Sequence, residues 1–359
     1  MNSVIKTELL GMDLKSLESY VQSLGEPRFR AKQIYAWIYR KAVSSFYEMS
    51  DIPKELRVSL DAAAQISIPR VLKQRVAADG TRKFLFEMND KKKIETVVIP
   101  QSRDKYPRYS LCISTQVGCP VGCLFCATGQ SGFQRNLKAY EMVGQVLGSR
   151  REMARKFKTD RELITHVVYM GMGEPMLNYD AVISSIHTLN DHKGINIGQR
   201  HITISTAGEV NGIRRLAEED LQVTLAISLH ACNDNLRDRL IPLNRKYPLQ
   251  LVLEAVRYYT ERTNRRVTFE YIMLDEVNMR PEDARAMISL IKPLLANVNL
   301  IPYNEVNGLE YKKPPSTTIR RFYNLLADGG LNVTLREEHG GDIEAACGQL
   351  SVNRERQTL

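Results

Sequence analysis

From residue 109 onward, short segments rich in β-branched residues alternate with longer amphipathic segments, and no other feature of the sequence limits the fold as strongly. The short segments have the composition of strands, and the longer ones have the apolar spacing of helices. The expected strands are residues 109–114, 165–170, 201–205, 222–228, 267–274, 298–302 and 331–336. The expected helices are residues 141–156, 179–190, 211–218, 249–263, 281–294 and 317–326. Consecutive units with right-handed crossovers form a parallel sheet, either doubly wound or curved into a barrel. Six such units favour an α/β partial (β/α)6 barrel of the TIM type.

The chain before residue 109 has a different pattern. FRAKQIYAWIYRK, which begins at Phe29, has apolar residues at helical spacing, and a second helix is expected over residues 53–60. RKFLFEMNDKKKIETVVIP alternates like a hairpin whose turn lies near Asn89 and Asp90. Three parts are therefore expected: a small helical domain over residues 1–75, a β-hairpin linker or extension over 76–108, and the barrel with a carboxy-terminal cysteine segment over 109–359.

Composition and charge narrow the class of protein. The 359 residues are 43% hydrophobic and 25% charged, as in an ordinary globular protein with a sizeable core. No apolar run approaches the roughly 20 residues of a membrane span, so we expect a cytoplasmic protein with no membrane partner. The net charge is +9, and residues 1–108 hold 20 basic against 13 acidic side chains. This balance favours a polyanion such as nucleic acid as the partner, bound through the amino-terminal third.

Three of the six cysteines form the pattern CxxxCxxC directly after the first expected strand. Cys119, Cys123 and Cys126 lie on the loop QVGCPVGCLFCATG, so their thiolates can converge on one metal centre. A structural zinc site is the simpler alternative. Such sites usually combine two CxxC or CxxH motifs, however, and the sequence has no second motif of this kind. A four-iron cluster held by three cysteines leaves one iron open to a small molecule. The position at a strand end, where barrel enzymes place their chemistry, favours the iron–sulfur cluster.

Other strand ends carry glycine, carboxylate, hydroxyl, imidazole and amide groups. These are Gly173 and Glu174 in YMGMGEP, Ser205 in HITISTAG, Ser228 and His230 in LAISLHA, and Asn304 in NLIPYN. Each alone has a structural explanation, such as a glycine turn, a helix cap or a buried histidine. The carboxyl ends of parallel strands meet at one rim, however, so together they predict a ligand site. GxGxxG is incomplete and no P-loop is present, which argues against a dinucleotide or P-loop nucleotide site.

Two further cysteines are expected at the same rim. Cys112 ends the first strand, and Cys347 lies in HGGDIEAACGQL beyond the last strand. The alternative for each is a buried structural cysteine, which is the expectation for Cys232. The topology brings both ends of the strand array to one face, so Cys112 and Cys347 are candidates for chemistry beside the metal centre.

Together these segments resemble the radical S-adenosylmethionine RNA adenine methyltransferases of the RlmN/Cfr family, and among them the RlmN type. The resemblance spans nearly the whole chain. It rests on IETVVIP, CISTQVGCPVGCLFCATG, MGMGEPMLN, RHITISTAG, ISLHA, NLIPYN and DIEAACGQL, in the family's order. The RlmN type methylates C2 of adenosine in ribosomal and transfer RNA. A sister type, which shares the cysteines, methylates C8, and the proline of GEPMLN favours the C2 type because the C8 type tends to have alanine there.

The resemblance implies a partial TIM-type barrel with a small helical amino-terminal domain, and it implies a role for each rim residue. The implied ligands of a 4Fe-4S cluster are Cys119, Cys123 and Cys126. The implied contacts to S-adenosylmethionine are Gly173, Glu174, Ser205, Ser228, Leu229, His230 and Asn304.

The implied chemistry uses two S-adenosylmethionine molecules per turnover. Cys347 would take a methyl group from the first. A radical made from the second would activate that methyl group for addition to C2. Cys112 would then remove the C2 proton and release the product by forming a transient disulfide with Cys347. Glu95, in IETVVIP, matches a family glutamate proposed as a proton acceptor; an exposed strand glutamate is the alternative.

The implied partners are RNA and an electron donor. The RNA would be 23S ribosomal RNA at the peptidyl transferase centre and transfer RNA at the adenosine 3′ of the anticodon, and the donor would be flavodoxin-like. The expected contacts to the RNA backbone are Arg28, Arg30, Lys32, Arg40, Lys41, Lys91, Lys92 and Lys93. The alternative for these residues is a solvated basic surface. We expect a monomer. The alternative from another class is a noncatalytic RNA-binding protein stabilised by a metal, which would be colourless and contain zinc instead of iron.

Overall fold

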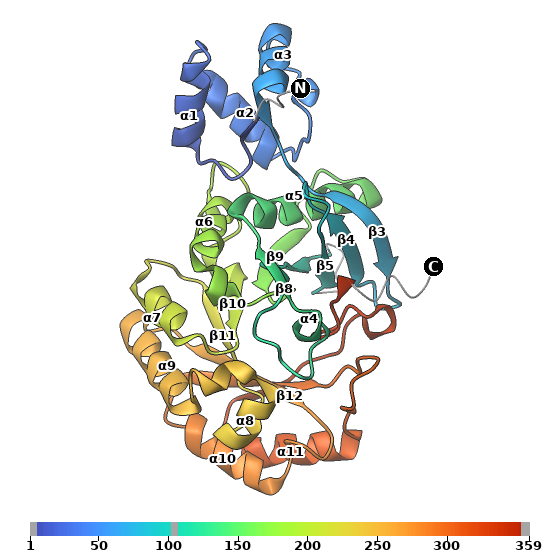
Figure 1. Cartoon of the computed structure of the whole chain (residues 1–359), viewed down its shortest axis with the longest axis vertical. Helices are drawn as coiled ribbons and strands as arrows, with labels where there is room; N and C mark the ends of the chain where they lie inside the picture. Colours follow the sequence, from blue (N-terminus) through green and yellow to red (C-terminus); the bar gives the residue numbers. More distant parts are fainter. Residues whose placement is uncertain (1–5, 102–106, 353–359) are drawn as a thin grey trace.

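The computed structural model describes residues 6–101 and 107–352, and a ten-stranded sheet forms its centre (Figure 1). In chain order the strands of this sheet are β3 (Arg70–Val76), β4 (Arg82–Glu87), β5 (Lys93–Pro100), β6 (Tyr109–Cys112), β9 (Ile164–Tyr169), β10 (Ile202–Thr206), β11 (Thr224–Ser228), β12 (Val267–Met273), β13 (Ala296–Pro302) and β14 (Val333–Leu335). Across the sheet they run β14, β13, β12, β11, β10, β9, β6, β5, β4, β3. Every neighbouring pair from β6 to β14 is parallel.

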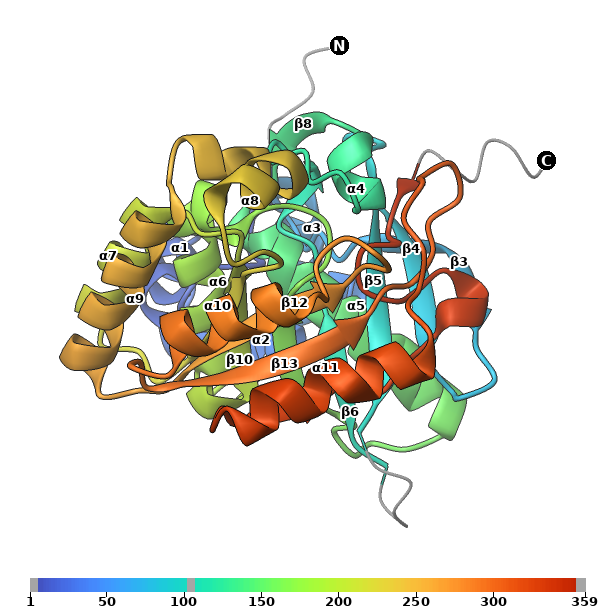
Figure 2. The ribbon, with the colours of Figure 1, turned by 90° about the horizontal axis from the view of Figure 1, so that it is seen from below.

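Helices connect the parallel strands in the predicted order. They are α5 (Ala139–Phe157), α6 (Tyr179–Asn190), α7 (Val210–Glu218), α9 (Leu249–Thr263), α10 (Pro281–Ile291) and α11 (Ser316–Asp328). Shorter elements in the loops are β7 (Gln116–Gly118), α4 (Ala127–Gln130), β8 (Phe133–Asn136) and α8 (Asp234–Leu240). Figure 2 shows α10 and α11 on either side of β13, outside the curved row of strands. The predicted α/β architecture of successive strand–helix units is confirmed.

Burial explains why these segments become strands and helices. β12, with the sequence VTFEYIM, is buried at every position except Thr268, as expected for a parallel strand covered on both faces. α7 buries Val210, Ile213 and Leu216, which recur at helical spacing on its inner face. Its amino end is capped by Glu209, whose carboxylate accepts a hydrogen bond from the backbone N–H of Gly212.

β3, β4 and β5 form an antiparallel extension on the edge of β6. β4 and β5 are the predicted hairpin, with Asn89 and Asp90 in its turn. The expectation that the helical segment reaches residue 75 is wrong, because residues 70–76 form β3 at the edge of the sheet. No side chain of β3 is buried, and its exposed charges, as on many edge strands, left no apolar period to read. The hairpin is therefore part of the central sheet.

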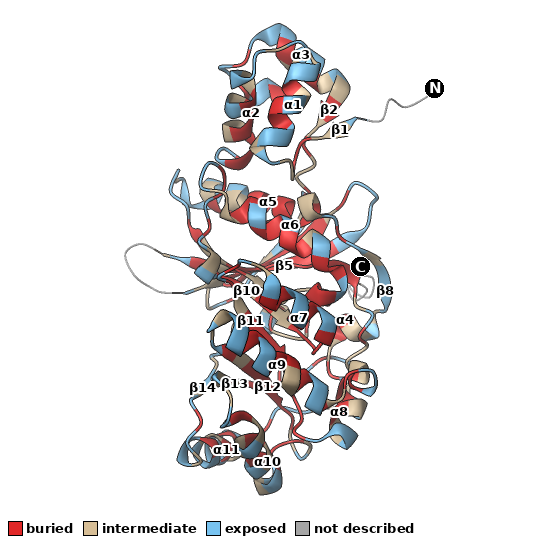
Figure 3. Cartoon of the chain, turned by 90° about the vertical axis from the view of Figure 1, so that its left-hand side faces the viewer, coloured by how far each residue is buried: buried red, intermediate tan, exposed pale blue. Residues whose placement is uncertain are grey.

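The helical domain forms a lobe at one end of the molecule (Figure 3). It contains β1 (Thr7–Glu8), α1 (Leu14–Ser23), α2 (Phe29–Tyr39), α3 (Lys54–Ala63) and β2 (Ala64–Gln65). α2 buries Ala31, Ile34, Tyr35 and Ile38, the residues that its spacing places on one face. The described residues include no helix with the length and apolar character of a membrane span.

Candidate active site

Two cavities with shared lining residues lie at the carboxyl ends of the parallel strands, and together they contain most of the side chains predicted for the site. The first is lined, among others, by Cys119, Cys123, Cys126, Gly173, Glu174, Ser205, Ser228, His230 and Cys347. The second is lined, among others, by Cys112, Cys126, Asn304, Arg336 and Cys347. The topology thus brings residues from opposite ends of the strand array to one rim.

The loop with three cysteines is held by backbone hydrogen bonds. The N–H of Cys126 donates to the carbonyl of Cys123 at 3.2 Å, and that of Cys119 donates to the carbonyl of Gly132 at 3.2 Å. The N–H of Ala127 donates to the carbonyl of Gly348 at 2.7 Å, which ties this loop to the residue after Cys347. Desolvation raises the pKa of all three thiols, that of Cys119 to about 12, so a metal must displace their protons on binding.

Glu174 is a buried carboxylate that the fold orients through both oxygens. Oε1 accepts from the N–H of Met176 at 3.0 Å, and Oε2 accepts from the N–H of Ala207 at 2.8 Å. Burial raises the pKa of Glu174 to about 7 in spite of these bonds. A positively charged amino group bound in the cavity would stabilise the carboxylate and reverse the shift.

The backbone conformation and the close packing at Gly173 require a glycine. Its φ is +105°, and a Cβ at this position would lie 2.7 Å from side-chain atoms of Thr115 and Gln116. The side chain of Gln116 also accepts a hydrogen bond from the N–H of Glu174 at 2.8 Å. The turn therefore packs directly against the segment after β6, an intramolecular reason for glycine that the sequence did not reveal.

His230 is a buried neutral imidazole held in a left-handed conformation, with φ of 55°. This conformation costs a non-glycine residue about 1–2 kcal/mol. Asn278 offsets the cost by donating from Nδ2 to the carbonyls of His230 at 2.9 Å and Ile272 at 2.7 Å. The N–H of Ile272 donates to Nδ1 of His230 at 3.0 Å, which leaves the ring proton on Nε2. Burial lowers the pKa of His230 to about 3, so the ring acts as a neutral donor.

Leu229 lies between two cavity residues but belongs to the hydrophobic core and lines neither cavity. Its carbonyl accepts from Nε of Arg237 at 3.1 Å. Arg237 is fully buried and also donates to the carbonyls of Ala207 at 2.7 Å and Ser228 at 3.0 Å, which joins the ends of β10 and β11. Sequence reasoning missed Arg237, because the charged segment DNLRDRL reads as an exposed helix.

Arg336 lines the second cavity together with Cys112 and Cys347. Desolvation, followed by the charge of Cys347, raises the pKa of Cys112 to about 12, and Arg336 opposes this shift. The charge of Cys347 in turn raises the pKa of Arg336. Nη1 of Arg336 lies 3.7 Å from Oε2 of Glu270, another buried residue of the first cavity. Sequence reasoning missed both residues, although Arg336 ends the last predicted strand, where the strand-end rule applies.

The segment with Cys347 docks on the antiparallel extension of the sheet. The N–H of Ser351 donates to Oε2 of Glu95 at 2.8 Å, and Nζ of Lys83 donates to the carbonyl of Glu344 at 3.0 Å. Glu95 is 1% exposed and forms an ion pair with Lys83 at 2.9 Å. It lines neither cavity, so the structure gives it a contact that holds this segment, and its role as a proton acceptor stays a prediction.

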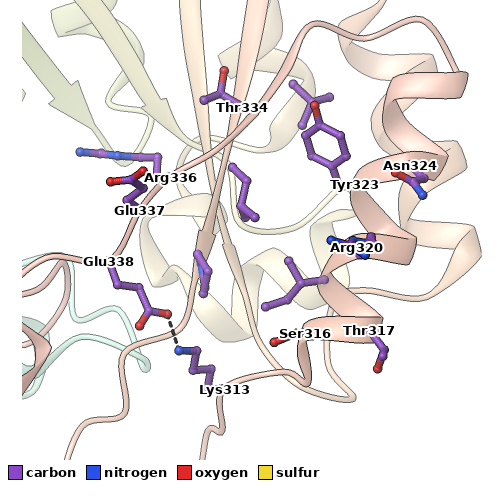
Figure 4. A pocket seen from close by; sticks show the side chains of 14 residues that line it. Lys313, Ser316, Thr317, Arg320, Tyr323, Asn324, Thr334, Arg336, Glu337 and Glu338 are labelled. Carbon is purple, nitrogen blue, oxygen red and sulfur yellow. Dashed lines mark ion pairs between the residues drawn. The ribbon is translucent and has the colours of Figure 1, made fainter.

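A larger cavity of about 970 Å³ lies between α11 and β14 (Figure 4). It shares Arg336 with the two cavities above, and Tyr323 and Arg320 line it from α11. An ion pair at 2.6 Å between Lys313 and Glu338 lies at its edge. Its described lining contains no cysteine, so the chemistry that the sequence predicts belongs to the smaller cavities.

The basic residues expected to contact RNA lie on two separate elements. Those of the helical domain are Arg28, Arg30, Lys32, Arg40 and Lys41, and those of the hairpin turn are Lys91, Lys92 and Lys93. All are exposed except the half-buried Arg30. Two of them are engaged in ion pairs, Arg28 with Glu18 and Lys91 with Glu87.

Comparison with known proteins identifies both parts of the chain. Residues 7–66 match the model described as ribosomal RNA large subunit methyltransferase N-terminal domain, and residues 113–288 match the radical SAM superfamily. The chain is 64% identical to the probable dual-specificity RNA methyltransferase RlmN of Syntrophomonas wolfei, over 98% of both chains. It is 45% identical to the RlmN of Halorhodospira halophila, over 96% of this chain and 93% of that one. The crystal structure of a radical SAM methyltransferase from Sphaerobacter thermophilus is 43% identical and has a TM-score of 0.91, covering 96% of this chain and 99% of that chain.

The radical SAM superfamily implies S-adenosylmethionine and a 4Fe-4S cluster, and the residues present fit both. Three thiols line one cavity on a single loop, and the oriented carboxylate of Glu174 faces the same space. With its fold, its rim of cysteines and its near full-length similarity to these relatives, the chain belongs to the RlmN family of radical SAM RNA methyltransferases.

Proposed function

We propose that the protein methylates C2 of an adenosine in the peptidyl transferase centre of 23S ribosomal RNA and of the adenosine 3′ of the anticodon in transfer RNAs, by way of a methyl group carried on Cys347. The observation that carries this proposal is that Cys112 and Cys347 line one cavity, and that Cys347 and Cys126 also line the cavity of the three-cysteine loop. The relatives' names, which describe dual-specificity RNA methyltransferases, support RNA of two kinds as the substrate.

The chemistry of adenine requires two thiols in addition to the cluster ligands. C2 is electron-poor and has no nucleophilic lone pair, so it cannot displace the methyl group of S-adenosylmethionine. When bound, the cluster on Cys119, Cys123 and Cys126 supplies the electron that cleaves S-adenosylmethionine into methionine and a 5′-deoxyadenosyl radical. The protein's own residues then have to carry the methyl carbon, remove one proton and release the product.

Cys347 carries the carbon. Its thiolate attacks the methyl group of a first S-adenosylmethionine and releases S-adenosylhomocysteine. The methylated sulfur would give up a hydrogen atom to the radical made from a second molecule, its carbon would add to C2, and the RNA-bound radical would return one electron to the cluster. Cys112 takes the C2 proton, and its thiolate then attacks the sulfur of Cys347, so that the bond between that sulfur and the transferred carbon breaks as the disulfide forms and the carbon takes up a proton to leave as the methyl group of the RNA. A flavodoxin-like protein is the proposed source of electrons.

The remaining rim residues bind S-adenosylmethionine in this proposal. The carboxylate of Glu174 binds its amino group, and Nε2 of His230 donates a hydrogen bond. Gly173, Ser205, Ser228 and Asn304 supply further contacts from the ends of their strands. Leu229, which lines neither cavity, supports this rim through its carbonyl, which accepts a hydrogen bond from Arg237. The protein is proposed to act as a monomer in the cytoplasm.

Mass spectrometry of adenosines tests the position of methylation. A strain in which this protein is the sole methylase of this family should contain 2-methyladenosine in 23S ribosomal RNA and in transfer RNA. The alternative, methylation at C8, is favoured by no observation on this chain except the shared cysteines. Detection of 8-methyladenosine without 2-methyladenosine would reject the proposed position.

Cysteine variants test the mechanism. Cys112→Ala should accumulate RNA bound covalently through Cys347, because the product cannot be released. Cys347→Ala should form no adduct and no product, and Cys232→Ala, in the core, is the matched control with near-normal turnover. A colourless protein that contains zinc and forms no adduct in any variant would instead support a noncatalytic RNA-binding protein.

A further inference from the structure

A cavity of about 630 Å³ lies at the opposite end of the same strands from the cysteines. His166, near the start of β9, and His201, directly before β10, line it together with Arg40 from the helical domain. His166 is five residues before Gly171, which lines the catalytic cavity. This separation corresponds to roughly 16 Å along a strand. The two sites are therefore distinct.

Cationic groups dominate this cavity. Arg108 and Arg150 line it in addition to Arg40, and His192 joins the other two histidines. Glu162 is the one carboxylate among the described residues of its wall. Three guanidinium groups against one carboxylate leave two excess positive charges even when every histidine is neutral. Convergence of this kind, from the helical domain and from the sheet, favours an anion.

Arg150 provides a second observation that points to a ligand. Its side chain is 9% exposed, and Nη1 donates to the carbonyl of Ile195 at 3.3 Å. Nε forms an ion pair with Oε2 of Glu162 at 2.8 Å, but among the described residues this N–H has no acceptor aligned for a hydrogen bond. A buried N–H that lacks an aligned acceptor is uncommon, and an anion in the cavity would supply one.

The two histidines of the strands form a coupled pair. Nε2 of His166 lies 2.6 Å from Nδ1 of His201, with the rings edge to face. One proton lies between these nitrogens, so protonation of both rings places two positive charges in contact. Burial, His201 and then Arg108 lower the pKa of His166. Arg40, Arg150 and His192 face the same space and oppose protonation, while Glu162 alone favours it.

We propose that this cavity binds a phosphate group, and that the group is a backbone phosphodiester of the RNA substrate. Guanidinium groups bind phosphate oxygens in pairs, and several of them around one space suit a tetrahedral anion. Arg40 and Arg108 fall in residues 1–108, which hold most of the positive surplus of the chain. Arg40 also belongs to the region that matches the ribosomal RNA methyltransferase N-terminal domain. The RNA assignment rests on the proposed function, whereas the phosphate site does not.

The test uses the full-length protein and two probes, inorganic phosphate and a transfer RNA. Phosphate binding is followed as a thermal shift against chloride at equal ionic strength. RNA affinity is measured from pH 6 to pH 8 at several salt concentrations. The variants are Arg40→Gln/Arg108→Gln and His166→Gln/His201→Gln. Arg266→Gln, an exposed arginine before β12 at the same end of the sheet, is the matched control.

The wild type and the control should show a phosphate-dependent shift that the double arginine variant lacks. RNA affinity of that variant should fall about tenfold at physiological salt, with a salt slope lower by roughly 1–2, while methylation of Cys347 by S-adenosylmethionine without RNA is unchanged. RNA affinity of the wild type should rise more from pH 8 to pH 6 than that of the double histidine variant, because a bound phosphate favours the protonated pair. Loss of the phosphate shift with unchanged RNA affinity would overturn the assignment to RNA. The same shift in all variants would overturn the site itself. A phosphate shift in a protein that methylates no RNA would reject the proposed function and leave the site standing.

Discussion

Glu95 has contacts that suit two roles. It lies two residues from Val97, which pairs with Cys112 across β5 and β6, so the side chains of Glu95 and Cys112 project from the same face of the sheet. At the same time its oxygens bind Lys83 and the N–H of Ser351. The position of Glu95 on the same sheet face as Cys112 supports a role as proton acceptor. Its contacts with Lys83 and Ser351 support a role in positioning the segment with Cys347.

Two variants that replace charged side chains by neutral amides separate the two roles of Glu95. Glu95→Gln keeps an acceptor for Ser351 but cannot take a proton, and it leaves Lys83 as an uncompensated buried charge. Lys83→Gln/Glu95→Gln removes that charge. If Glu95 accepts a proton, RNA methylation by both variants should fall at least about 100-fold, while both still methylate Cys347. Recovery of most activity in the double variant would show that Glu95 only positions the segment. Thermal melts of both variants check that they fold.

Glu174 makes the stability of the ligand-free protein depend on pH. Its pKa in the folded chain is about 7 against the ordinary value of 4.5, so the folded state favours the protonated form. This contribution is fully present below about pH 4.5 and is lost as the pH rises through 7. By linkage it amounts to at most about 3 kcal/mol. Urea unfolding at pH 5 and pH 8 should therefore show a larger fall in the free energy of unfolding for the wild type than for Glu174→Gln. Equal falls in the free energy of unfolding for the two proteins would contradict the raised pKa of Glu174.

At the scale of elements, the site depends on the docking of the carboxy-terminal segment on the turn between β3 and β4. Oδ2 of Asp79 accepts from the N–H of Gly340 at 3.2 Å and lies 2.9 Å from Nδ1 of His339. Asp79→Ala should loosen residues 339–350, because both contacts are lost. We expect faster hydrogen exchange there and RNA methylation at least tenfold lower, with little change in the exchange of β9 and β10. Asp328→Ala, exposed at the end of α11, is the control. Unchanged exchange after Asp79→Ala would contradict this role.

Local pattern determined which elements could be predicted. The parallel strands and their helices lie within three residues of the expected ranges, because the strands are short apolar runs and the helices bury one face at helical spacing. β3 has no buried residue and lacks such a period. The contacts of Asp79 with residues 339 and 340 join positions some 260 residues apart, which no local pattern records. Arg237 in the short helix α8 and Asn278 in the loop after β12 are buried polar residues in segments whose composition favours exposure.

At the scale of the whole molecule, the RNA has to reach the cysteine rim while charges elsewhere on the surface hold its backbone. Three adjacent exposed lysines lie in the hairpin turn between β4 and β5 and at the first residue of β5, and β5 itself contains Glu95, which binds the docked segment with Cys347. The turn is thus joined to the catalytic rim through a single strand. Phosphate contacts at such a turn would position the RNA without selecting its sequence.

Replacement of these lysines tests that arrangement. In Lys91→Gln/Lys92→Gln/Lys93→Gln, the slope of log affinity against log salt should fall by roughly 2–3, because each lost phosphate contact removes about 0.7–0.9. Turnover at saturating RNA should change less than about twofold, since none of the three lysines lines the catalytic cavities. The matched control replaces three exposed arginines in and after α9, Arg257, Arg262 and Arg266. Binding of transfer RNA from 50 to 300 mM salt measures both slopes. An equal fall in the control would mean that net charge attracts the RNA, and that the hairpin turn makes no contact of its own.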